Sequence, residues 1–319
     1  MILEGADKPL VYQDVADPQG DAEHAIVRVK AAALNHRDLF IRQGQYAGIK
    51  YPAILGSDGS GVLDKGNREV IINPTLNWGS DPRAQQKIFR ILGLPDDGTL
   101  AEHVKVPTEN LADKPAHLTH EQAAALPLAG LTAYRALFTR ANVQKGERVL
   151  ITGIGGGVAL FALQFAVAVG AAVFVTSGSA EKLAQAKAMG ALGGANYKED
   201  KWADVLRTQA GEFEVIVDGT AGDGLNTLCD VAAAGGRLAF YGGTLGNPKE
   251  VIWRRIFWKQ LTVLGSTMGT PADFAAMVAF VNEHKIVPTV DSVFALADAN
   301  AALQRMAAAA QFGKIVLRI

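Results

Sequence analysis

The stretch Arg148–Ala159, which reads R-V-L-I-T-G-I-G-G-G-V-A, decides the fold class of this chain. An apolar run rich in β-branched residues meets a cluster of glycines, and a long apolar segment follows. This order predicts a buried strand, a tight turn and the beginning of a buried helix. Such a turn directs backbone N–H groups and the positive end of the helix at a diphosphate. We therefore predict that the stretch binds a dinucleotide.

The glycines of this turn do not follow the strict G-x-G-x-x-G spacing. The spacing that fits is Gly153-x-x-Gly156-x-x-Ala159. Glycines are also ordinary turn residues, so a plain strand-to-helix turn stays an alternative interpretation. The residues expected to contact the diphosphate are Gly153, Gly155, Gly156, Gly157 and Val158.

Length and composition exclude several classes of protein. The 319 residues are enough for about two domains of roughly 150 residues each, and the net charge of −1 predicts no nucleic-acid partner. The single cysteine, Cys229, excludes an internal disulfide framework and a zinc lobe with several cysteines. The first five residues lack a signal-peptide pattern, and the longest apolar stretch, Val158–Val169, is too short to cross a bilayer. We expect a cytoplasmic protein with no membrane partner.

The first 110 residues predict an irregular β-rich unit. The segment Asn77–Gly98 has a different character and predicts a surface excursion, in which Asp81–Leu92 is expected to hold a helical turn. The expected strands of this unit are Ala25–Ala31, Ala53–Leu63 with three glycines inside it, Val70–Asn73 and Ala101–Val106.

Strands alternate with helices after Thr119, which begins a segment with the pattern of a capped helix. This alternation predicts a parallel sheet that is covered by helices on both faces. The expected strands are Arg148–Thr152, Ala172–Thr176, Glu214–Asp218, Gly236–Tyr241 and Leu261–Gly265, and the expected helices are Gly157–Val169, Ala180–Met189, Lys201–Gln209, Gly224–Ala233 and Pro271–His284. The chain is expected to end in a helix, Ala297–Ala309, and a strand, Lys314–Ile319.

The end of the second strand of this unit predicts which dinucleotide binds. An acidic residue at this point favours NAD, whereas small or basic residues admit the 2′-phosphate of NADP. Here the strand ends without an acid, Ser177 and Ser179 offer hydroxyl groups, and Lys182 follows one turn into the next helix. We therefore predict NADPH as the cofactor. The alternative is that Ser179 only caps the helix and Lys182 is a solvated charge, and both interpretations can hold together.

Six further segments carry a family resemblance. They are A-L-N-H-R-D-L at Ala33–Leu39, Arg42-x-Gly44-x-Tyr46, the glycine-rich Pro52–Gly61, D-G-T-L-A-E-H at Asp97–His103, Ala125–Tyr134, and F-G-K-I-V-L at Phe312–Leu317. Together they resemble the medium-chain dehydrogenase/reductase superfamily over nearly the whole chain. The resemblance implies an α/β protein in which a Rossmann doubly wound parallel sheet is joined to a β-rich GroES-like catalytic domain. The Rossmann domain would span residues 120–268, and the GroES-like domain residues 1–119 and 269–319.

The zinc ligands of this superfamily are missing. Its zinc alcohol dehydrogenases hold catalytic zinc with a Cys in the first segment and a His-Glu pair in the second. This chain has Asn35, Ser57 and Asp58 there, and one carboxylate cannot replace a thiolate and an imidazole. We predict no metal. The resemblance is therefore closer to the zinc-independent quinone oxidoreductase and enoyl reductase branches, whose glycine turn this chain shares except at Ala159.

This resemblance implies NADPH-dependent transfer of hydride to a quinone or to an activated alkene or carbonyl. A conjugated substrate needs mainly orientation and a donor for its developing negative charge. The resemblance implies that Asn35 and Thr132 lie near the nicotinamide, and it matches Tyr46 with a tyrosine that acts as an acid in enoyl reductases. Tyr46 is otherwise a packing aromatic residue, and Asn35 a turn-forming side chain.

Further cofactor contacts are expected from the resemblance and from the ends of the strands, where ligands bind in such sheets. The residues are Tyr197, Gly219, Thr220, Gly242, Gly243 and Met268. Family members commonly dimerise through the edge of the Rossmann sheet, so we expect a homodimer with Leu261–Gly265 beside its symmetry mate. Three other functions stay open: an enoyl-thioester reductase that uses Tyr46, a zinc alcohol dehydrogenase with atypical ligands, and a non-catalytic protein that binds NADPH.

Overall fold

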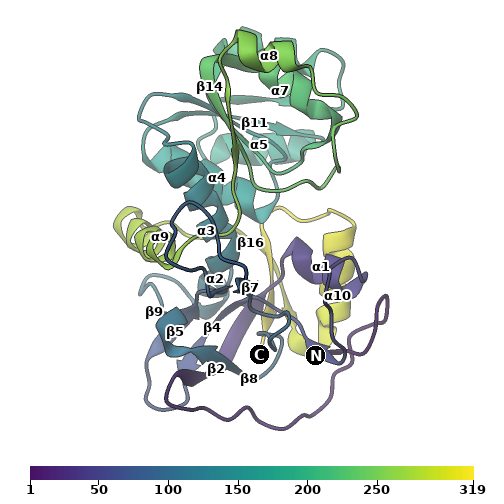
Figure 1. The fold of residues 1–319 in the computed structure, drawn as a ribbon, viewed down its shortest axis with the longest axis vertical. Coiled ribbons are helices and arrows are strands. Elements are labelled where there is room, and N and C mark those ends of the chain that lie inside the picture. Colours follow the sequence, from purple (N-terminus) through teal and green to yellow (C-terminus); the bar gives the residue numbers. More distant parts are fainter. The chain divides into compact units, whose positions relative to one another are not determined.

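The computed structural model describes all residues from Met1 to Ile319, and the chain divides into two compact units (Figure 1). The first unit is Met1–Leu131 with Gly269–Ile319, and the second is Thr132–Met268. The predicted Rossmann domain begins earlier, at residue 120. Helix α2 (His120–Ala124) packs on strands of the first unit, which is why this compact unit extends beyond residue 119. No helix is long and apolar enough to cross a membrane.

The second unit contains a six-stranded parallel sheet with the order β12-β11-β10-β13-β14-β15. The chain runs outward from β10 to β12 and then returns to the other side of β10, so the strand order reverses between β10 and β13. Ligands bind at such a reversal, beyond the carboxyl ends of the strands. The strands are β10 (Arg148–Ile151), β11 (Ala172–Ser177), β12 (Gly193–Asn196), β13 (Phe213–Asp218), β14 (Ala232–Phe240) and β15 (Thr262–Gly265), and the helices are α4 (Gly157–Ala168), α5 (Ala180–Ala188), α6 (Trp202–Ala210), α7 (Leu225–Val231) and α8 (Trp253–Trp258).

Buried apolar strands hold this sheet between its helices. Val149, Leu150 and Ile151 of β10 are fully buried, and most of α4 is buried too. Phe174 and Phe213 meet edge to face with their ring centroids 5.6 Å apart, beneath the helices that cover this side of the sheet. The doubly wound parallel sheet that the sequence predicts is confirmed.

The first unit is built on a seven-stranded sheet with the order β16-β17-β2-β4-β5-β9, in which β8 also pairs with β2. Its neighbouring strands are antiparallel except β16 and β17. The strands are β2 (His24–Ala33), β4 (Asp58–Leu63), β5 (Glu69–Ile72), β8 (His103–Pro107), β9 (Leu111–Asp113), β16 (Val290–Ala295) and β17 (Lys314–Arg318). Because β17 pairs with β2, the end of the chain becomes part of the N-terminal core.

Shorter elements complete the chain. Two small ladders join β1 (Ile2–Leu3) to β3 (Ala53–Ile54) and β6 (Thr75–Leu76) to β7 (Arg90–Ile91). The remaining helices are α1 (His36–Arg42), α3 (Pro127–Tyr134), α9 (Pro271–His284) and α10 (Ala299–Ala307), with the short turns η1 (Thr108–Asn110), η3 (Gly222–Gly224) and η4 (Leu296–Asp298) and the π-helix η2 (Arg135–Arg140). The predicted cap of α2 is confirmed, since the Thr119 hydroxyl accepts from the Gln122 amide at 3.3 Å.

The helical turn predicted within Asp81–Leu92 is wrong. The segment contains turns and the strand β7, which pairs with β6. Its local hydrogen bonds explain the difference, because the Asp81 carboxylate accepts from both the backbone and the guanidinium of Arg83 and thereby holds a turn. Trp78 also packs edge to face on Phe89, with ring centroids 5.5 Å apart, which folds the segment back on itself.

Candidate functional site

The glycine turn connects β10 to α4 at the reversal point of the sheet. Gly153 and Gly155 have φ of 64° and 120°, a conformation that costs a glycine little and other residues more. Gly156 is the N-cap residue of α4, and no side chain caps this end of the helix. The N–H groups of its first turn therefore stay available to an anion, and the helix dipole favours negative charge there.

The helix that follows β11, α5, brings Lys182 to this turn. A Cβ atom added at Gly155 would lie 2.9 Å from Cδ and 3.3 Å from Nζ of Lys182, so the lysine side chain lies against the glycines. The Ser179 hydroxyl accepts from the Lys182 backbone amide at 3.3 Å and caps α5. Ser177 accepts from the Ser179 amide at 3.2 Å. Ser179 therefore caps α5, as one interpretation of the sequence predicts, and Lys182 also places a positive charge near the end of β11.

Tyr197 and Lys198 complete a basic cluster at the same strand end. A Cβ atom at Gly178 would lie 2.7 Å from Cε of Lys198 and 2.9 Å from the Tyr197 hydroxyl, so both side chains border the loop after β11. Lys198 is not among the residues predicted from the sequence, because β12, the strand that carries the lysine to this edge, is not predicted either. Two ammonium groups, with hydroxyl groups beside them, are suited to holding a phosphate.

A buried carboxylate organises the loop after β13. Asp218 is fully buried and accepts from the hydroxyls of Thr152 and Thr220 and from the amide of Ala221, the last two at 2.7 Å. These bonds bring the Thr220 methyl close to Gly153, where an added Cβ would be 3.3 Å away. They also hold Ala221 at a φ of 51°, which only glycine adopts easily. Sequence reasoning singled out Thr220 and missed Asp218, although a buried acid at the end of a strand signals such a role.

The loop after β14 lies against the loop after β13. A Cβ at Gly219 would come within 2.5 Å of the Tyr241 ring, and a Cβ at Gly242 within 2.9 Å of the Gly219 carbonyl oxygen. Burial and the nearby charge of Asp218 raise the pKa of Tyr241, so its phenol stays protonated. Met268 follows β15 and is 4 % exposed. The carboxyl end of the sheet thus carries all the predicted cofactor residues: Gly153, Gly155, Gly156, Gly157, Val158, Ser177, Ser179, Lys182, Tyr197, Gly219, Thr220, Gly242, Gly243 and Met268.

The first unit contains a second polar cluster, around Asp58. The Lys314 ammonium donates to Oδ1 of Asn35 at 2.6 Å and to Oδ2 of Asp58 at 2.9 Å. The Asn35 amide donates to the same Oδ2 at 2.9 Å, and the Leu128 backbone amide donates to Oδ1 at 2.7 Å. Asp58 is 0 %, Lys314 4 % and Asn35 8 % exposed. Every polar group of this cluster therefore has a partner inside the protein, and the Asn35 side chain is engaged in it.

Arg37 lies beside this cluster and was missed in the sequence. Its guanidinium donates to the Ser57 hydroxyl at 2.6 Å and to the Leu92 carbonyl at 2.9 Å, while its buried Nε–H has no acceptor. The guanidinium carbon lies 5.6 Å from the centre of the Tyr46 ring. Burial raises the pKa of the neighbouring Asp38, and the charge of Arg37 acts against this shift. Arg37 is thus a buried cation with an unused donor.

Tyr46 and Thr132 differ in their exposure. Tyr46 is 37 % exposed, so its ring packs over Arg37 while part of it stays accessible. Both interpretations of Tyr46, as a donor and as a packing aromatic, are compatible with this position. Thr132 is 5 % exposed and belongs to α3. The catalytic roles of Asn35, Tyr46 and Thr132 stay predictions.

Comparison with known proteins assigns the family. Residues 21–116 match the family described as "Alcohol dehydrogenase GroES-like domain", and residues 157–283 match "Zinc-binding dehydrogenase". The "Zinc-type alcohol dehydrogenase-like protein YogA" of Leptosphaeria maculans is 33 % identical, over 98 % of this chain and 95 % of that protein. The chain belongs to the medium-chain dehydrogenase/reductase superfamily.

Other members of the superfamily are similar over nearly the full length. A crystal structure titled "NAD-dependent alcohol dehydrogenase" superposes with a TM-score of 0.95 at 35 % identity, covering 100 % of this chain and 98 % of the other. A "Quinone oxidoreductase" of Pseudomonas aeruginosa is 28 % identical over 98 % of this chain and 96 % of that protein. The predicted GroES-like and Rossmann folds are therefore confirmed, while the relatives carry the names of different activities.

One matching family and one relative have zinc in their names, but the residues of this chain do not fit a zinc ion. No group of three or more His, Cys, Asp or Glu side chains is arranged to hold a metal. Both oxygens of Asp58 already accept hydrogen bonds, and Lys314 brings a positive charge into direct contact with one of them. The Ser57 hydroxyl donates to the Leu92 carbonyl at 2.8 Å. An ammonium group in contact with the one available carboxylate opposes a divalent cation there.

Removing the Lys314 charge tests whether the cluster is closed in this way. We expect Lys314→Met to lower the free energy of unfolding by about 3–5 kcal/mol, because Asp58 would then be a buried carboxylate without its cation. Urea titration followed by tryptophan fluorescence measures the loss. The double variant Lys314→Met/Asp58→Asn removes both charges and should recover part of the stability. Equal stability of Lys314→Met and the parent protein would contradict the buried pair.

Proposed function

We propose that this chain is an NADPH-dependent, zinc-independent reductase of quinones or other activated alkenes and carbonyls. The observation that carries the proposal is a closed cluster in which Lys314 bonds to Asn35 and Asp58, two of the three residues at the positions of the superfamily's zinc ligands. A reaction that relies on a metal to polarise an alcohol lacks its ligands here. A conjugated substrate is already activated, so it requires orientation and a hydrogen-bond donor rather than a metal.

The preference for NADPH rests on the basic cluster at the end of β11. Lys198 and the Tyr197 hydroxyl border the loop that contains Ser177 and Ser179, and the Lys182 side chain lies against Gly155 of the glycine turn. We propose that these groups hold the 2′-phosphate, while the turn at Gly153–Val158 receives the diphosphate. When bound, NADPH supplies the hydride.

We propose Tyr46 as the hydrogen-bond donor to the substrate and Arg37 as the fixed positive charge beside it. The Nε–H of Arg37 is buried and lacks an acceptor, and the Tyr46 ring lies 5.6 Å from the guanidinium carbon. A fixed cation stabilises the negative charge that develops on a carbonyl oxygen when the conjugated carbon accepts a hydride. Asn35, whose side chain is engaged with Asp58 and Lys314, would act by keeping this region in place.

A substrate panel tests the proposed function. We expect the purified protein to oxidise NADPH with benzoquinone and with 2-cyclohexenone, and to keep this activity after dialysis against a chelator. Absorbance at 340 nm measures the rate, and elemental analysis measures the metal content. The proposal would be contradicted if the protein contained a stoichiometric metal, oxidised simple alcohols, and lost this activity when the metal was removed. Preference for crotonyl-coenzyme A, abolished in Tyr46→Phe, would favour the enoyl-thioester alternative instead.

Variants of the basic cluster test the cofactor. We expect Lys182→Ala and Lys198→Ala each to weaken NADPH binding about tenfold, the effect of losing one charged hydrogen bond to a phosphate, and to leave NADH binding nearly unchanged. Titration calorimetry measures both cofactors. Lys187→Ala is the control, because Lys187 is exposed near the end of the same helix α5. Equal losses for NADH and NADPH, or no loss for either, would contradict the assignment of the 2′-phosphate.

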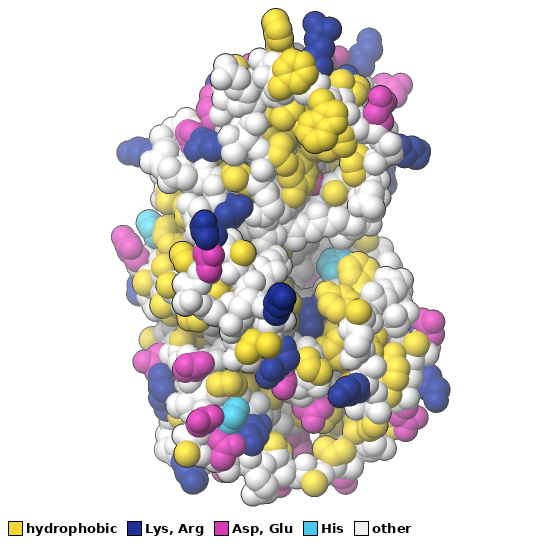
Figure 2. Space-filling model, viewed as in Figure 1, with side chains coloured by type: hydrophobic (Ala, Val, Ile, Leu, Met, Phe, Trp, Pro, Cys, Tyr) yellow, Lys and Arg dark blue, Asp and Glu magenta, His cyan; other side chains and the backbone are white.

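We also propose a homodimer formed through β15. This strand is the last in its sheet, so one edge of its backbone has no neighbouring strand, and Val263 on it is 48 % exposed. The preceding helix α8 exposes three large aromatic side chains: Trp253, Phe257 and Trp258 are 68 %, 63 % and 74 % exposed. Figure 2 shows apolar side chains gathered in the upper part of the view, where Figure 1 labels α8. An open strand edge beside exposed aromatics favours pairing with a second copy.

A charge on the edge strand tests the dimer. We expect the parent protein to have twice the 33.7 kDa mass of the chain, and Val263→Lys to shift it to the monomer mass, because a lysine on an edge strand opposes pairing. Light scattering after size exclusion measures both. Val293→Lys is the matched control, since Val293 is 42 % exposed on β16, the edge strand of the other sheet. A monomeric parent protein, or an unchanged mass for Val263→Lys, would contradict the proposal.

A further inference from the structure

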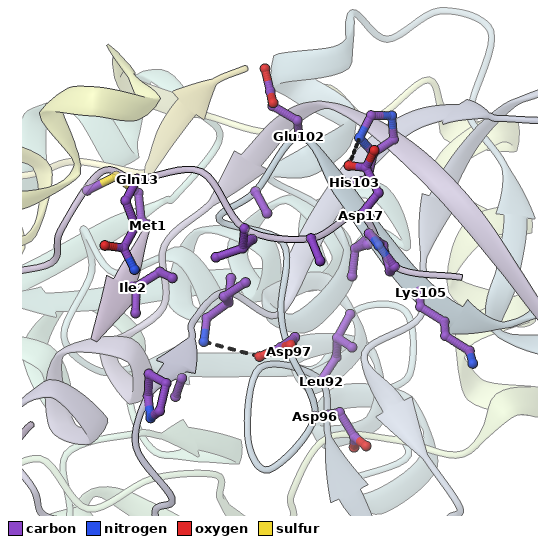
Figure 3. A pocket seen from close by; sticks show the side chains of 18 of the residues that line it. Met1, Ile2, Gln13, Asp17, Leu92, Asp96, Asp97, Glu102, His103 and Lys105 are labelled. Atoms are coloured by element: carbon purple, nitrogen blue, oxygen red, sulfur yellow. Dashed lines mark hydrogen bonds and ion pairs between the residues drawn. The ribbon is translucent and has the colours of Figure 1, made fainter. Parts of the chain in front are cut away.

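A cavity of about 710 Å³ lies inside the first unit and takes no part in the function proposed above (Figure 3). It lies beneath an extended segment of the chain, Tyr12–Pro18, here called the strap. Strands β3, β6, β7 and β8 contribute to its other walls. The residues that line it include neither Asn35, Asp58 and Lys314 nor any residue of the second unit. Its size is in the range of small-molecule binding sites.

The floor of the cavity is apolar. It is made by side chains that also belong to the core of the unit and are between 1 and 7 % exposed: Ile2, Leu76, Leu92, Val104 and Leu296. These residues come from distant parts of the chain, so the floor depends on the folded sheet. A ligand in the cavity would therefore meet hydrocarbon on this side, which favours an apolar body there.

The rim of the cavity is negatively charged. Five carboxylates line the cavity, namely Asp14, Asp17, Asp96, Asp97 and Glu102, against two residues with a permanent positive charge, Arg90 and Lys105. Both cations are already paired: Arg90 with Asp96 at 2.7 Å, and Lys105 with Asp21, outside the cavity, at 2.8 Å. Asp14 and Glu102 are exposed and have no partner in the protein. The cavity thus has negative charge in excess, and a cation would complement it.

The backbone of the strap is hydrogen-bonded to the rest of the unit only at its ends. At one end, Val11 exchanges two backbone hydrogen bonds with Ile2, and the Leu10 backbone exchanges two with the side chain of Asn300. At the other end, the Asp21 amide donates to the His24 carbonyl at 3.2 Å. Residues 12 to 20 make no backbone hydrogen bond to another segment. Between these ends, the Asp17 carboxylate lies 3.7 Å from the His103 ring of β8 (Figure 3). The backbone of the strap therefore takes no part in the sheet, and displacing it would break no hydrogen bond between strands.

We propose that the cavity under the strap binds an amphipathic organic amine, with its apolar body on the floor and its ammonium group at the acidic rim. An anion of the same shape would meet the unpaired carboxylates and be repelled. A neutral molecule would bind without placing a positive charge beside these carboxylates. A bare metal ion does not fit, because no three ligating side chains converge here or elsewhere in the chain.

Dansylcadaverine, which joins an aromatic body to a primary ammonium group, is the probe for the test. Binding to the full-length protein is followed by the blue shift of dansyl emission, with neutral dansylamide and anionic dansylglycine as matched probes. We expect saturable binding of dansylcadaverine at one site, weaker binding of dansylamide and the weakest of dansylglycine. Binding of the ammonium probe should also weaken as salt is raised, because exposed charges are screened.

Two pairs of substitutions locate the site. Asp14→Asn/Glu102→Gln should weaken dansylcadaverine binding about fivefold, as expected for two exposed charge pairs. Asp14→Lys/Glu102→Lys should reverse the preference toward dansylglycine. All four changes are at exposed side chains, so folding should be preserved, and Asp64→Asn, an exposed acid outside the cavity, is the control. The proposal fails if the three probes bind equally, if no probe saturates, or if the control weakens binding as much as the cavity variants do.

Discussion

The buried ion pair between Asp58 and Lys314 is the interaction on which the first unit depends. The lysine comes from the last strand of the chain and the aspartate from β4, and Asn35 and the Leu128 amide join them. Four segments distant in sequence are thereby fixed at one point. Taking a carboxylate and an ammonium out of water is costly unless each finds its partners, and here each does. The same contacts exclude a divalent cation from the place where zinc-dependent members of the superfamily hold their metal.

The second unit uses a buried carboxylate for a different purpose. Asp218 accepts hydrogen bonds from Thr152, Thr220 and Ala221, so the loops after β10 and β13 are joined where the strand order reverses. This network has no cation within it and consists of hydroxyl and amide donors. It holds the loop after β13 beside the glycine turn, and the absence of a side chain at Gly153 allows Thr220 to approach closely. The sheet fixes where the two loops lie, and the hydrogen bonds to Asp218 fix their conformation.

The Rossmann unit was predictable from the sequence because its signals are local. An apolar run followed by glycines needs a buried strand and a tight turn, whatever the rest of the chain does. The excursion at Asn77–Gly98 was not predictable in the same way. Its conformation depends on the Asp81–Arg83 turn and on the packing of Trp78 against Phe89, contacts that no periodic pattern announces.

The sequence by itself determined the parallel sheet and the position of the glycine turn. It also determined that Asn35 and Ser57 stand where zinc-dependent members have ligands. Each of these follows from the residue types and their spacing along the chain. Only the tertiary structure decided which side chains meet. It joined Lys314 to Asp58, brought Lys198 beside Gly178 and left a donor of Arg37 without an acceptor. The physical reason is that charge pairing and desolvation act over a few ångströms in space, and residues hundreds of positions apart reach that distance only when the sheets have formed.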